Sequence, residues 1–420
     1  MIKKILSDSF IYTVANILTK AIGFIMIPVY TTFLSTKEYG VVDLLVVTGS
    51  IISVVIGLEI HQAVSRFFPE SNNNDKITIV STAFWSIVFL YVFFIICTTP
   101  FYSRISVFLF DSTKYKEIVF IAFLSFGFNF IYYYCSSQLK WQLKSKQNLL
   151  VSFIYSLIVA IITYFMLLYG YGIMSVFIAQ IIASIVCAIL SYMYSKEYYA
   201  FIFNLSCLKK MISFSLPLVF SVIMAYAMVY ADRFIIKYFL SVEDVGIYGI
   251  AFRFASVITL LTSGIQTALT PLIYTHYRDK NTPASIAKIF NYFIILSILL
   301  ICFLFCFSEH IVRLVANEFY IKAATIIPWL SISILFIGII NFAPGVFIAK
   351  KTSYVLYINI CSLVLNILLN LVLIKKYELM GSAYATAISS FIYFMLYCVI
   401  GQKYYYIPYF WTRNNFKLRR

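Results

Sequence analysis

The feature that most restricts the fold of this chain is a series of about twelve apolar runs, each close to the roughly 20 residues that a membrane-spanning helix needs. The runs are unbroken and lack the short alternating pattern of barrel strands, so they indicate helices. Hydrophobic residues make up 62% of the 420 residues and charged residues only 11%, too little polar surface for a soluble protein. We therefore predict an all-α polytopic membrane protein with spans near residues 9–33, 41–66, 77–101, 117–138, 148–169, 173–195, 211–239, 246–275, 287–308, 323–348, 354–374 and 381–400.

The chain also repeats itself over about half of its length. The segment FLSTKEYG begins at Phe33, and FLSVEDVG begins at Phe239, 206 positions later. The same ungapped offset aligns Tyr171 with Tyr377 near the end of each half. We infer an ancestral duplication that gives about twelve helices in two six-helix repeats. An even number of spans per repeat gives both halves the same orientation, and many secondary transporters place their substrate path between such repeats.

The repeat predicts two lobes, residues 1–206 and residues 207–400, followed by a basic cytoplasmic tail at residues 401–420. Lys3 and Lys4 precede an apolar segment that is too long for the core of a signal peptide, with no small-residue cleavage pattern after it. We expect this segment to remain as the first span.

Basic residues predict the orientation of the chain. With both termini in the cytoplasm, most Lys and Arg residues between spans fall on inside segments, as in the cluster of Lys140, Lys144 and Lys146. The formal charge of +16 is then mainly a topology signal, with anionic membrane lipids as the expected partner. This distribution gives no reason to expect nucleic acid as a partner.

Several kinds of chemistry have no motif in this sequence. Eight cysteines and three histidines are spread along the chain without the spacing that a metal site needs. The phosphate-binding pattern GxxxxGK[ST] does not occur, and no Ser/His/Asp arrangement can be argued. We expect ordinary buried thiols, no metal or other cofactor, and no enzymatic activity.

Lys20 is the clearest of three cations within predicted spans, where an ionisable side chain costs several kcal/mol unless it meets a partner or a wet cavity. Tyr12 and Asn16 precede it at helical spacing and form one polar stripe on an apolar helix. Lys20 and Asn16 are therefore candidates for a substrate path. The alternative is a lysine that extends to the membrane surface or pairs with an acid for structural reasons.

A second candidate face lies on the span at residues 211–239. Tyr226, Tyr230 and Arg233 follow at i, i+4 and i+7, so two phenols and a guanidinium share one side of the helix. Tyrosine rings stack on sugars and Arg binds phosphate with a planar fork, so this face suits a phosphorylated sugar. Asp232 and Arg233 can equally anchor the span at the membrane interface, and Asp232 is also a candidate for ion coupling.

The third cation is Arg253, about two turns into the span at residues 246–275. In the second span, Glu59 and Arg66 are seven residues apart and share a face of a continuous helix, with His61 well off that face. Glu59 either pairs statically with Lys20 or Arg66, or binds and releases a coupling ion such as a proton.

Three segments of the chain carry a family resemblance. The opening SFIYTVANILTKAIGFIMIPVYTTFLSTKEYGVVDL, the AVSRFF that closes the second span and the later DRFIIKYFLSVEDVGIYGIAFRF resemble bacterial Wzx-type polysaccharide-unit flippases. These flippases are members of the multidrug/oligosaccharidyl-lipid/polysaccharide (MOP) exporter superfamily. The resemblance runs essentially end to end, and its elements are diagnostic of the superfamily more than of the substrate.

The resemblance implies a MATE-like two-lobed bundle in the bacterial inner membrane. Such a protein would move an undecaprenyl-pyrophosphate-linked oligosaccharide, the repeat unit of an O-antigen or capsule, to the periplasmic face, driven by a gradient of H⁺ or Na⁺. Its implied partners include a polysaccharide polymerase and a chain-length regulator. Lys20, Arg233 and Arg253 are the positions that would supply a cationic central cavity.

Three alternatives have weight. A lipid II-type flippase of the same superfamily is the closest rival. A MATE drug exporter would share the helices and the duplication but would more often bury acids for cationic substrates. A polysaccharide polymerase is an enzyme that typically carries one large periplasmic loop, whereas the longest outside segments here, near residues 102–116 and 309–322, are short.

Overall fold

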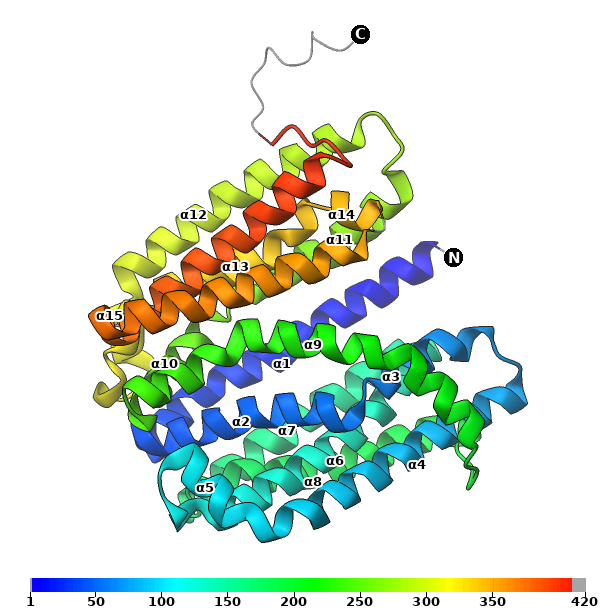
Figure 1. The fold of residues 1–420 in the computed structure, drawn as a ribbon, viewed down its shortest axis with the longest axis horizontal. Helices are drawn as coiled ribbons and strands as arrows, with labels where there is room; N and C mark the ends of the chain where they lie inside the picture. The colour runs from blue at the N-terminus through cyan, green and yellow to red at the C-terminus, as the bar shows by residue number, and fades with distance from the viewer. Residues whose placement is uncertain (1, 350, 410–420) are drawn as a thin grey trace. The chain divides into compact units, whose positions relative to one another are not determined.

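A computed structural model of the protein describes residues 2–349 and 351–409, with side chains from residue 17 onward except at residues 267, 268, 271, 272 and 352. These residues form helices and connecting turns, without any strand (Figure 1). The α-helices are α1 (Ile2–Phe33), α2 (Thr36–Gly57), α3 (Ile60–Phe67), α4 (Asn73–Thr98), α5 (Tyr102–Phe110), α6 (Lys116–Trp141), α7 (Ser145–Leu168), α8 (Met174–Ser195), α9 (Leu205–Phe239), α10 (Val242–Ala255), α11 (Ile258–His276), α12 (Thr282–Val315), α13 (Ala323–Gly338), α14 (Gly345–Ile348) and α15 (Thr352–Gln402).

Every span predicted from the apolar runs falls mainly on helical residues, so the all-α polytopic prediction is confirmed. In the described part of the chain, nine helices are long and apolar enough to cross a membrane, and α10 with α11 makes a tenth if this bent pair is one span. The predicted spans 354–374 and 381–400 both lie in α15, which is interrupted at Glu378. The first predicted span corresponds to α1, of which Ile17–Phe33 forms a shorter apolar helix.

Contacts divide the chain into two compact units. The first unit contains Met1–Tyr230 and Val242–Gly246, and the second contains Ala231–Ser241 and Ile247–Arg420. The lobe boundary expected between residues 206 and 207 falls at the start of α9, whereas the units divide inside that helix, after Tyr230.

The first unit is built around α6, α7 and α8, which lie side by side (Figure 1). A core of buried residues joins α3, α4 and α6 through Ile60, Val80 and Tyr134, and the Tyr134 hydroxyl donates to the Val80 carbonyl at 2.8 Å. Gly57 permits close packing of α2 against α6, because a Cβ there would lie 2.2 Å from the Phe130 ring. The apolar runs therefore pack as predicted, with small residues where two helices come nearest.

The two copies of the repeated segment meet within the first unit. A Cβ on Gly40 would lie 1.9 Å from the Val242 carbonyl oxygen, and a Cβ on Gly246 would lie 1.9 Å from that of Thr36. The Thr36 hydroxyl also donates to the Glu243 carboxylate at 2.9 Å. Only glycine fits at either crossing position, so the duplicated sequence is matched by a duplicated contact.

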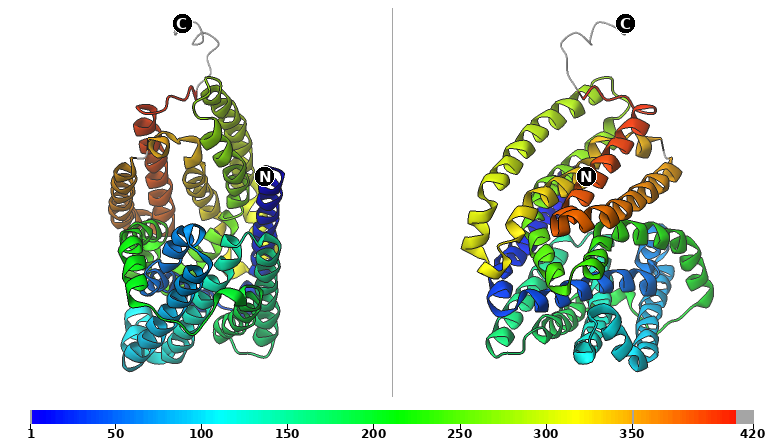
Figure 2. Two further views of the ribbon diagram at one scale, coloured as in Figure 1. Left: turned by 90° about the vertical axis from the view of Figure 1, so that its right-hand side faces the viewer. Right: turned by 60° about the vertical axis from the view of Figure 1, so that its left-hand side comes forward.

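In the second unit, α15 folds back on itself at Glu378, whose φ of 52° interrupts the helix. Figure 2 shows its two arms, in orange and red. The Ser382 hydroxyl donates to Asn370 at 2.8 Å, and the Asn366 amide donates to Ser389 at 2.9 Å. Side chains from one polar face thus hold the two arms together, as polar residues do between membrane helices.

Candidate functional site

A break between α2 and α3 positions the acidic residue of the second predicted span. Leu58 and Glu59 both have left-handed backbone conformations, with φ of 48° and 50°. Non-glycine residues rarely adopt this region, at a cost of about 1–3 kcal/mol each, and such residues cluster at functional sites. The break ends α2 at Gly57 and starts α3 at Ile60, so Glu59 does not follow the register of a continuous helix.

The Glu59 carboxylate lies beside the His61 ring, with 3.6 Å between Oε2 and Nε2. The side chains of His61 and Glu59 are only 9% and 7% exposed. The His61 ring packs edge-on against Tyr133, with ring centres 5.1 Å apart.

The expectation that Glu59 shares a face and a static pair with Arg66, with His61 off that face, is wrong. The reason is that the helix breaks beside Glu59, and Arg66 instead pairs with Glu70 on an exposed turn. Among the described residues, the basic side chain that lies nearest to the Glu59 carboxylate is therefore that of His61, not that of Arg66 or Lys20.

Glu59 and His61 line a polar cavity of about 340 Å³ inside the first unit. Its walls come from α2, α3, α6 and α9, and its hydrogen-bonding side chains include Glu59, His61, Gln62, Asn129, Tyr133 and Tyr226. A volume of this size lies at the lower end of small-molecule sites. The carboxylate, amides and phenols provide the donors and acceptors that a sugar needs, and the phenol rings provide apolar faces for its C–H surfaces.

Two of the predicted tyrosines lie next to each other on α9. The rings of Tyr226 and Tyr230 are stacked, with centres 5.9 Å apart and planes tilted by 17°. Tyr226 lines the polar cavity. The structure thus brings Tyr226 and Glu59 together, although the sequence placed them on different spans with no stated connection.

Arg233 and Asp232 lie in the second unit and are buried, with side chains 1% and 2% exposed. Arg233 Nη1 donates to Asp232 Oδ1 at 2.6 Å. The other carboxylate oxygen, Oδ2, accepts from the Tyr248 hydroxyl at 2.8 Å and lies 3.5 Å from the Thr386 hydroxyl. The guanidinium carbon lies 4.4 Å from the centre of the Phe252 ring.

This geometry is that of a desolvated ion pair with hydrogen bonds to the acid and an aromatic contact for the base. Of the two readings left open by the sequence, it supports a structural anchor. A substrate contact by Arg233 and ion coupling by Asp232 stay predictions.

Lys20 and Arg253 are not among the residues that line the polar cavity. Lys20 is exposed on α1 in the first unit, and Arg253 is half-buried in the last turn of α10 in the second unit. The Arg253 carbonyl accepts from the Ser256 hydroxyl at 2.6 Å. Asn16 lies on α1 among the residues whose side chains are outside the described part of the structure.

Sequence reasoning missed Gln62, Asn129 and Tyr133 as cavity residues. Asn129 and Tyr133 are one helical turn apart within the predicted span 117–138, so their shared polar face was a usable signal. The Asn129 amide also donates to the Tyr155 hydroxyl at 2.5 Å. No group of three or more His, Cys, Asp or Glu side chains in the described residues is arranged to hold a metal ion.

Two family models match the chain. The model of the family described as "Polysaccharide biosynthesis protein" matches residues 5–276, and the MatE model matches residues 217–372. No curated protein matches the sequence. The polar cavity described above lies entirely within the region of the first match.

Solved structures with similar folds cover almost the whole chain. The lipid II flippase MurJ, in an inward closed conformation, has a TM-score of 0.79 at 17% identity over 95% of this chain and 87% of its own. An inward-facing multidrug resistance MATE family transporter of the MOP superfamily has a TM-score of 0.74 at 14% identity over 95% of this chain and 97% of its own.

A MOP superfamily transporter from Pyrococcus furiosus, described as having a binding pocket of reverse polarity, has a TM-score of 0.67 at 15% identity, over 96% of this chain and 95% of its own. These likenesses show that the helices have a MATE-like fold, as the sequence predicted. Because the first family model covers more than half of the residues, this multi-pass membrane protein belongs to the Polysaccharide biosynthesis protein family.

Proposed function

We propose that the protein is a flippase that moves an undecaprenyl-pyrophosphate-linked oligosaccharide, the repeat unit of an O-antigen or capsule, across the bacterial inner membrane. The observation that carries this proposal is the polar cavity of Glu59, His61 and Tyr226, which lies within the part of the chain matched by the polysaccharide biosynthesis model. Hydrogen-bonding groups gathered inside an apolar helical body favour a polar cargo over a purely apolar one.

The cargo would need separate contacts for its sugars and its pyrophosphate. Phenols and amides of the cavity would hydrogen-bond sugar hydroxyls. A pyrophosphate would exchange its hydration for cations, and Lys20 and Arg253 are the proposed donors because neither is sealed in the core. Arg233 would join them only if its contact with Asp232 opened.

The driving force we propose is a gradient of H⁺ or Na⁺. Glu59 is the first candidate for coupling, since its carboxylate lines a polar cavity beside the His61 ring. Asp232 is the second candidate, although both of its oxygens accept hydrogen bonds from neighbouring side chains. No other cofactor is proposed.

The proposed setting is the inner membrane, with both termini in the cytoplasm. The expected partners there are anionic lipids, a polysaccharide polymerase and a chain-length regulator, and the protein itself would act without enzymatic chemistry. A lipid II-type flippase is the second candidate function, favoured by the similarity of fold to the lipid II flippase MurJ over 95% of the chain.

A deletion strain separates these functions. We expect it to lose a surface polysaccharide and to accumulate lipid-linked repeat units on the cytoplasmic face, while cell-wall precursors stay at normal levels. Accumulated lipid II would instead favour the second candidate. Normal surface polymer together with normal levels of lipid-linked repeat units and of lipid II would remove both.

Complementation of the deletion strain tests the proposed pyrophosphate contact. Lys20→Ala should fail to restore export, whereas Lys20→Arg should restore part of it because the charge is kept in a different shape. Both variants must reach the membrane in the amount of the unaltered protein. Normal polysaccharide with Lys20→Ala would show that Lys20 does not contact the substrate.

A further inference from the structure

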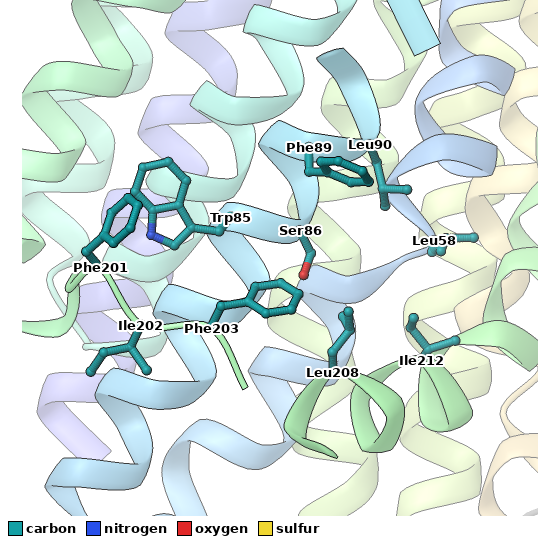
Figure 3. A pocket seen from close by; sticks show the side chains of 10 residues that line it. All are labelled: Leu58, Trp85, Ser86, Phe89, Leu90, Phe201, Ile202, Phe203, Leu208 and Ile212. Carbon is teal, nitrogen blue, oxygen red and sulfur yellow. The ribbon is translucent and has the colours of Figure 1, made fainter. Parts of the chain in front are cut away.

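A second cavity in the first unit has a different character. It is an apolar pocket of about 610 Å³ between α4, the connection at residues 199–204 and the first turns of α9 (Figure 3). Its walls include Trp85, Phe89, Phe203, Leu208 and Ile212. The hydroxyl of Ser86, which also lines it, donates to the Thr82 carbonyl at 2.6 Å. The pocket therefore offers an occupant apolar contact rather than hydrogen bonds.

The connection that forms one wall is fixed by side chains of α4. The Trp85 indole donates to the Ala200 carbonyl at 3.2 Å, and the Ala200 amide donates to the Ser81 hydroxyl at 2.8 Å. The Asn204 amide donates to the Thr82 hydroxyl at 3.1 Å. These bonds hold an extended segment in place, so the pocket is preformed and needs little ordering to accept a ligand.

Large apolar side chains of the pocket are nevertheless exposed. Phe201 is 90% exposed and Phe89 is 68% exposed, and Phe201 packs edge-on against Trp85 at 4.9 Å between ring centres. In a membrane protein such a surface meets lipid. A concave, preformed surface differs from the flat outer face of a span because it can enclose one chain on several sides.

Basic residues lie at the same end of the unit as the pocket. The Lys210 ammonium lies 4.9 Å from the centre of the Phe67 ring, and that of Lys76 lies 5.3 Å from the centre of the Phe68 ring. Of the acids at this end, Glu70 is paired with Arg66, and Asp75 is exposed in the first turn of α4.

Lys209 directly follows the pocket residue Leu208. It is exposed, and within the described residues it makes no ion pair, hydrogen bond or ring contact. Lys209 is thus an exposed basic residue in the same turn of α9 as the pocket residue Leu208.

We propose that this pocket binds one acyl chain of an anionic phospholipid, whose headgroup phosphate is held by Lys209. The apolar walls match the chain, and the basic residues at the pocket's end of the unit match the charge of the headgroup. A peptide would leave its backbone groups without partners in this pocket, so a lipid chain fits its chemistry better.

Fluorescence of Trp85 tests the proposal directly, because its indole forms part of the pocket wall. A variant with Trp141, Trp329 and Trp411 replaced by Phe keeps Trp85 as the sole reporter. It is reconstituted with phosphatidylglycerol or phosphatidylcholine carrying brominated acyl chains, which quench indole on contact. We expect phosphatidylglycerol to reach half-maximal quenching at a mole fraction about fivefold lower than phosphatidylcholine does. This ratio corresponds to about 1 kcal/mol for one lysine near a charged headgroup.

Two matched variants control the measurement. Lys209→Gln should abolish the preference for phosphatidylglycerol, whereas Lys146→Gln, at an exposed lysine of α7, should keep it. In a further control, Trp85→Phe and Leu299→Trp move the sole tryptophan to position 299 of α12, where Leu299 is 64% exposed. Both lipids should quench this tryptophan equally.

Three results would overturn the proposal. One is equal quenching of Trp85 by the two lipids, as at position 299. Another is a preference that survives Lys209→Gln. The third is relief of quenching by trace undecaprenyl phosphate, which would assign the pocket to an isoprenyl chain.

Discussion

Two acidic residues at the depth of the spans lie in different surroundings. Glu59 lines a polar cavity beside His61, whereas Asp232 is enclosed with Arg233 and Tyr248. The sequence identified both acids because charge within an apolar run is costly and therefore informative. It could not assign their partners, since the helix break beside Glu59 occurs at Leu58, a residue that predicts no break.

Glu59→Gln tests the acid of the cavity. Gln keeps the shape and the hydrogen-bonding groups of the side chain but cannot change charge, so we expect transport to fall strongly while the amount of folded protein in the membrane changes little. Glu70→Gln, which removes the exposed partner of Arg66, is the matched control and should transport normally. Full transport by Glu59→Gln would exclude a coupling role for Glu59.

Arg233→Ala tests the buried ion pair. Removing one partner leaves the charge of Asp232 buried without its base, which costs about 3–5 kcal/mol. We expect much less folded protein by gel-filtration of the detergent-solubilised variant, and recovery in the double variant Asp232→Asn with Arg233→Met. A well-folded Arg233→Ala that fails only in transport would instead support substrate contact.

At the scale of helices, the apolar runs predicted where the long helices lie but not the breaks that separate α2 from α3 and α10 from α11. The turn at Glu378 lies between two predicted spans, and Asn366 and Asn370 are four residues apart on one polar face of the span at residues 354–374. That this face joins the two arms of α15 could not be predicted, because a polar stripe alone does not distinguish a helix contact from a path lining. The repeated glycines were visible as well, but not their mutual contact.

The crossing of the repeated segments gives a stability prediction. Gly40→Ala should lower the free energy of unfolding of the purified protein by about 1–3 kcal/mol, the usual cost of overpacking, and lower its melting temperature accordingly. The reason is that the added Cβ would collide with the Val242 carbonyl. Gly23 on α1 has no heavy atom within 4 Å of an added Cβ, so Gly23→Ala should change stability by less than about 1 kcal/mol. Equal melting temperatures for the two variants would contradict the described crossing.

At the scale of the whole molecule, the apolar composition was enough to predict an all-α membrane protein, and the family resemblance implied the MATE-like fold that the solved structures share. The residue at which the two compact units divide could not be predicted from the sequence. The repeat locates the boundary by sequence, near residue 206, whereas the units divide within α9 after Tyr230. One continuous helix can contribute residues to two packed units, and the apolar pattern of its sequence does not indicate which residues pack in which unit.

Orientation is tested by reporter fusions. Because basic residues between spans favour the cytoplasm, alkaline phosphatase fused at Lys144 should be inactive, and fused at Thr36 or Glu309 it should be active. Immunoblots should show comparable amounts of each fusion. The opposite pattern would reverse the orientation and with it the proposed direction of transport.

The most direct test of the proposed function is translocation by the purified protein. Lipid-linked oligosaccharide extracted from the deletion strain is reconstituted in proteoliposomes, and a membrane-impermeant glycosidase is added outside. With the protein and an imposed ion gradient, we predict that cleavage will proceed beyond the outer-leaflet share to nearly all of the lipid, and that Glu59→Gln will stop it at that share. Cleavage that ends at the outer-leaflet share with the unaltered, folded protein would contradict the assignment as a lipid-linked oligosaccharide flippase.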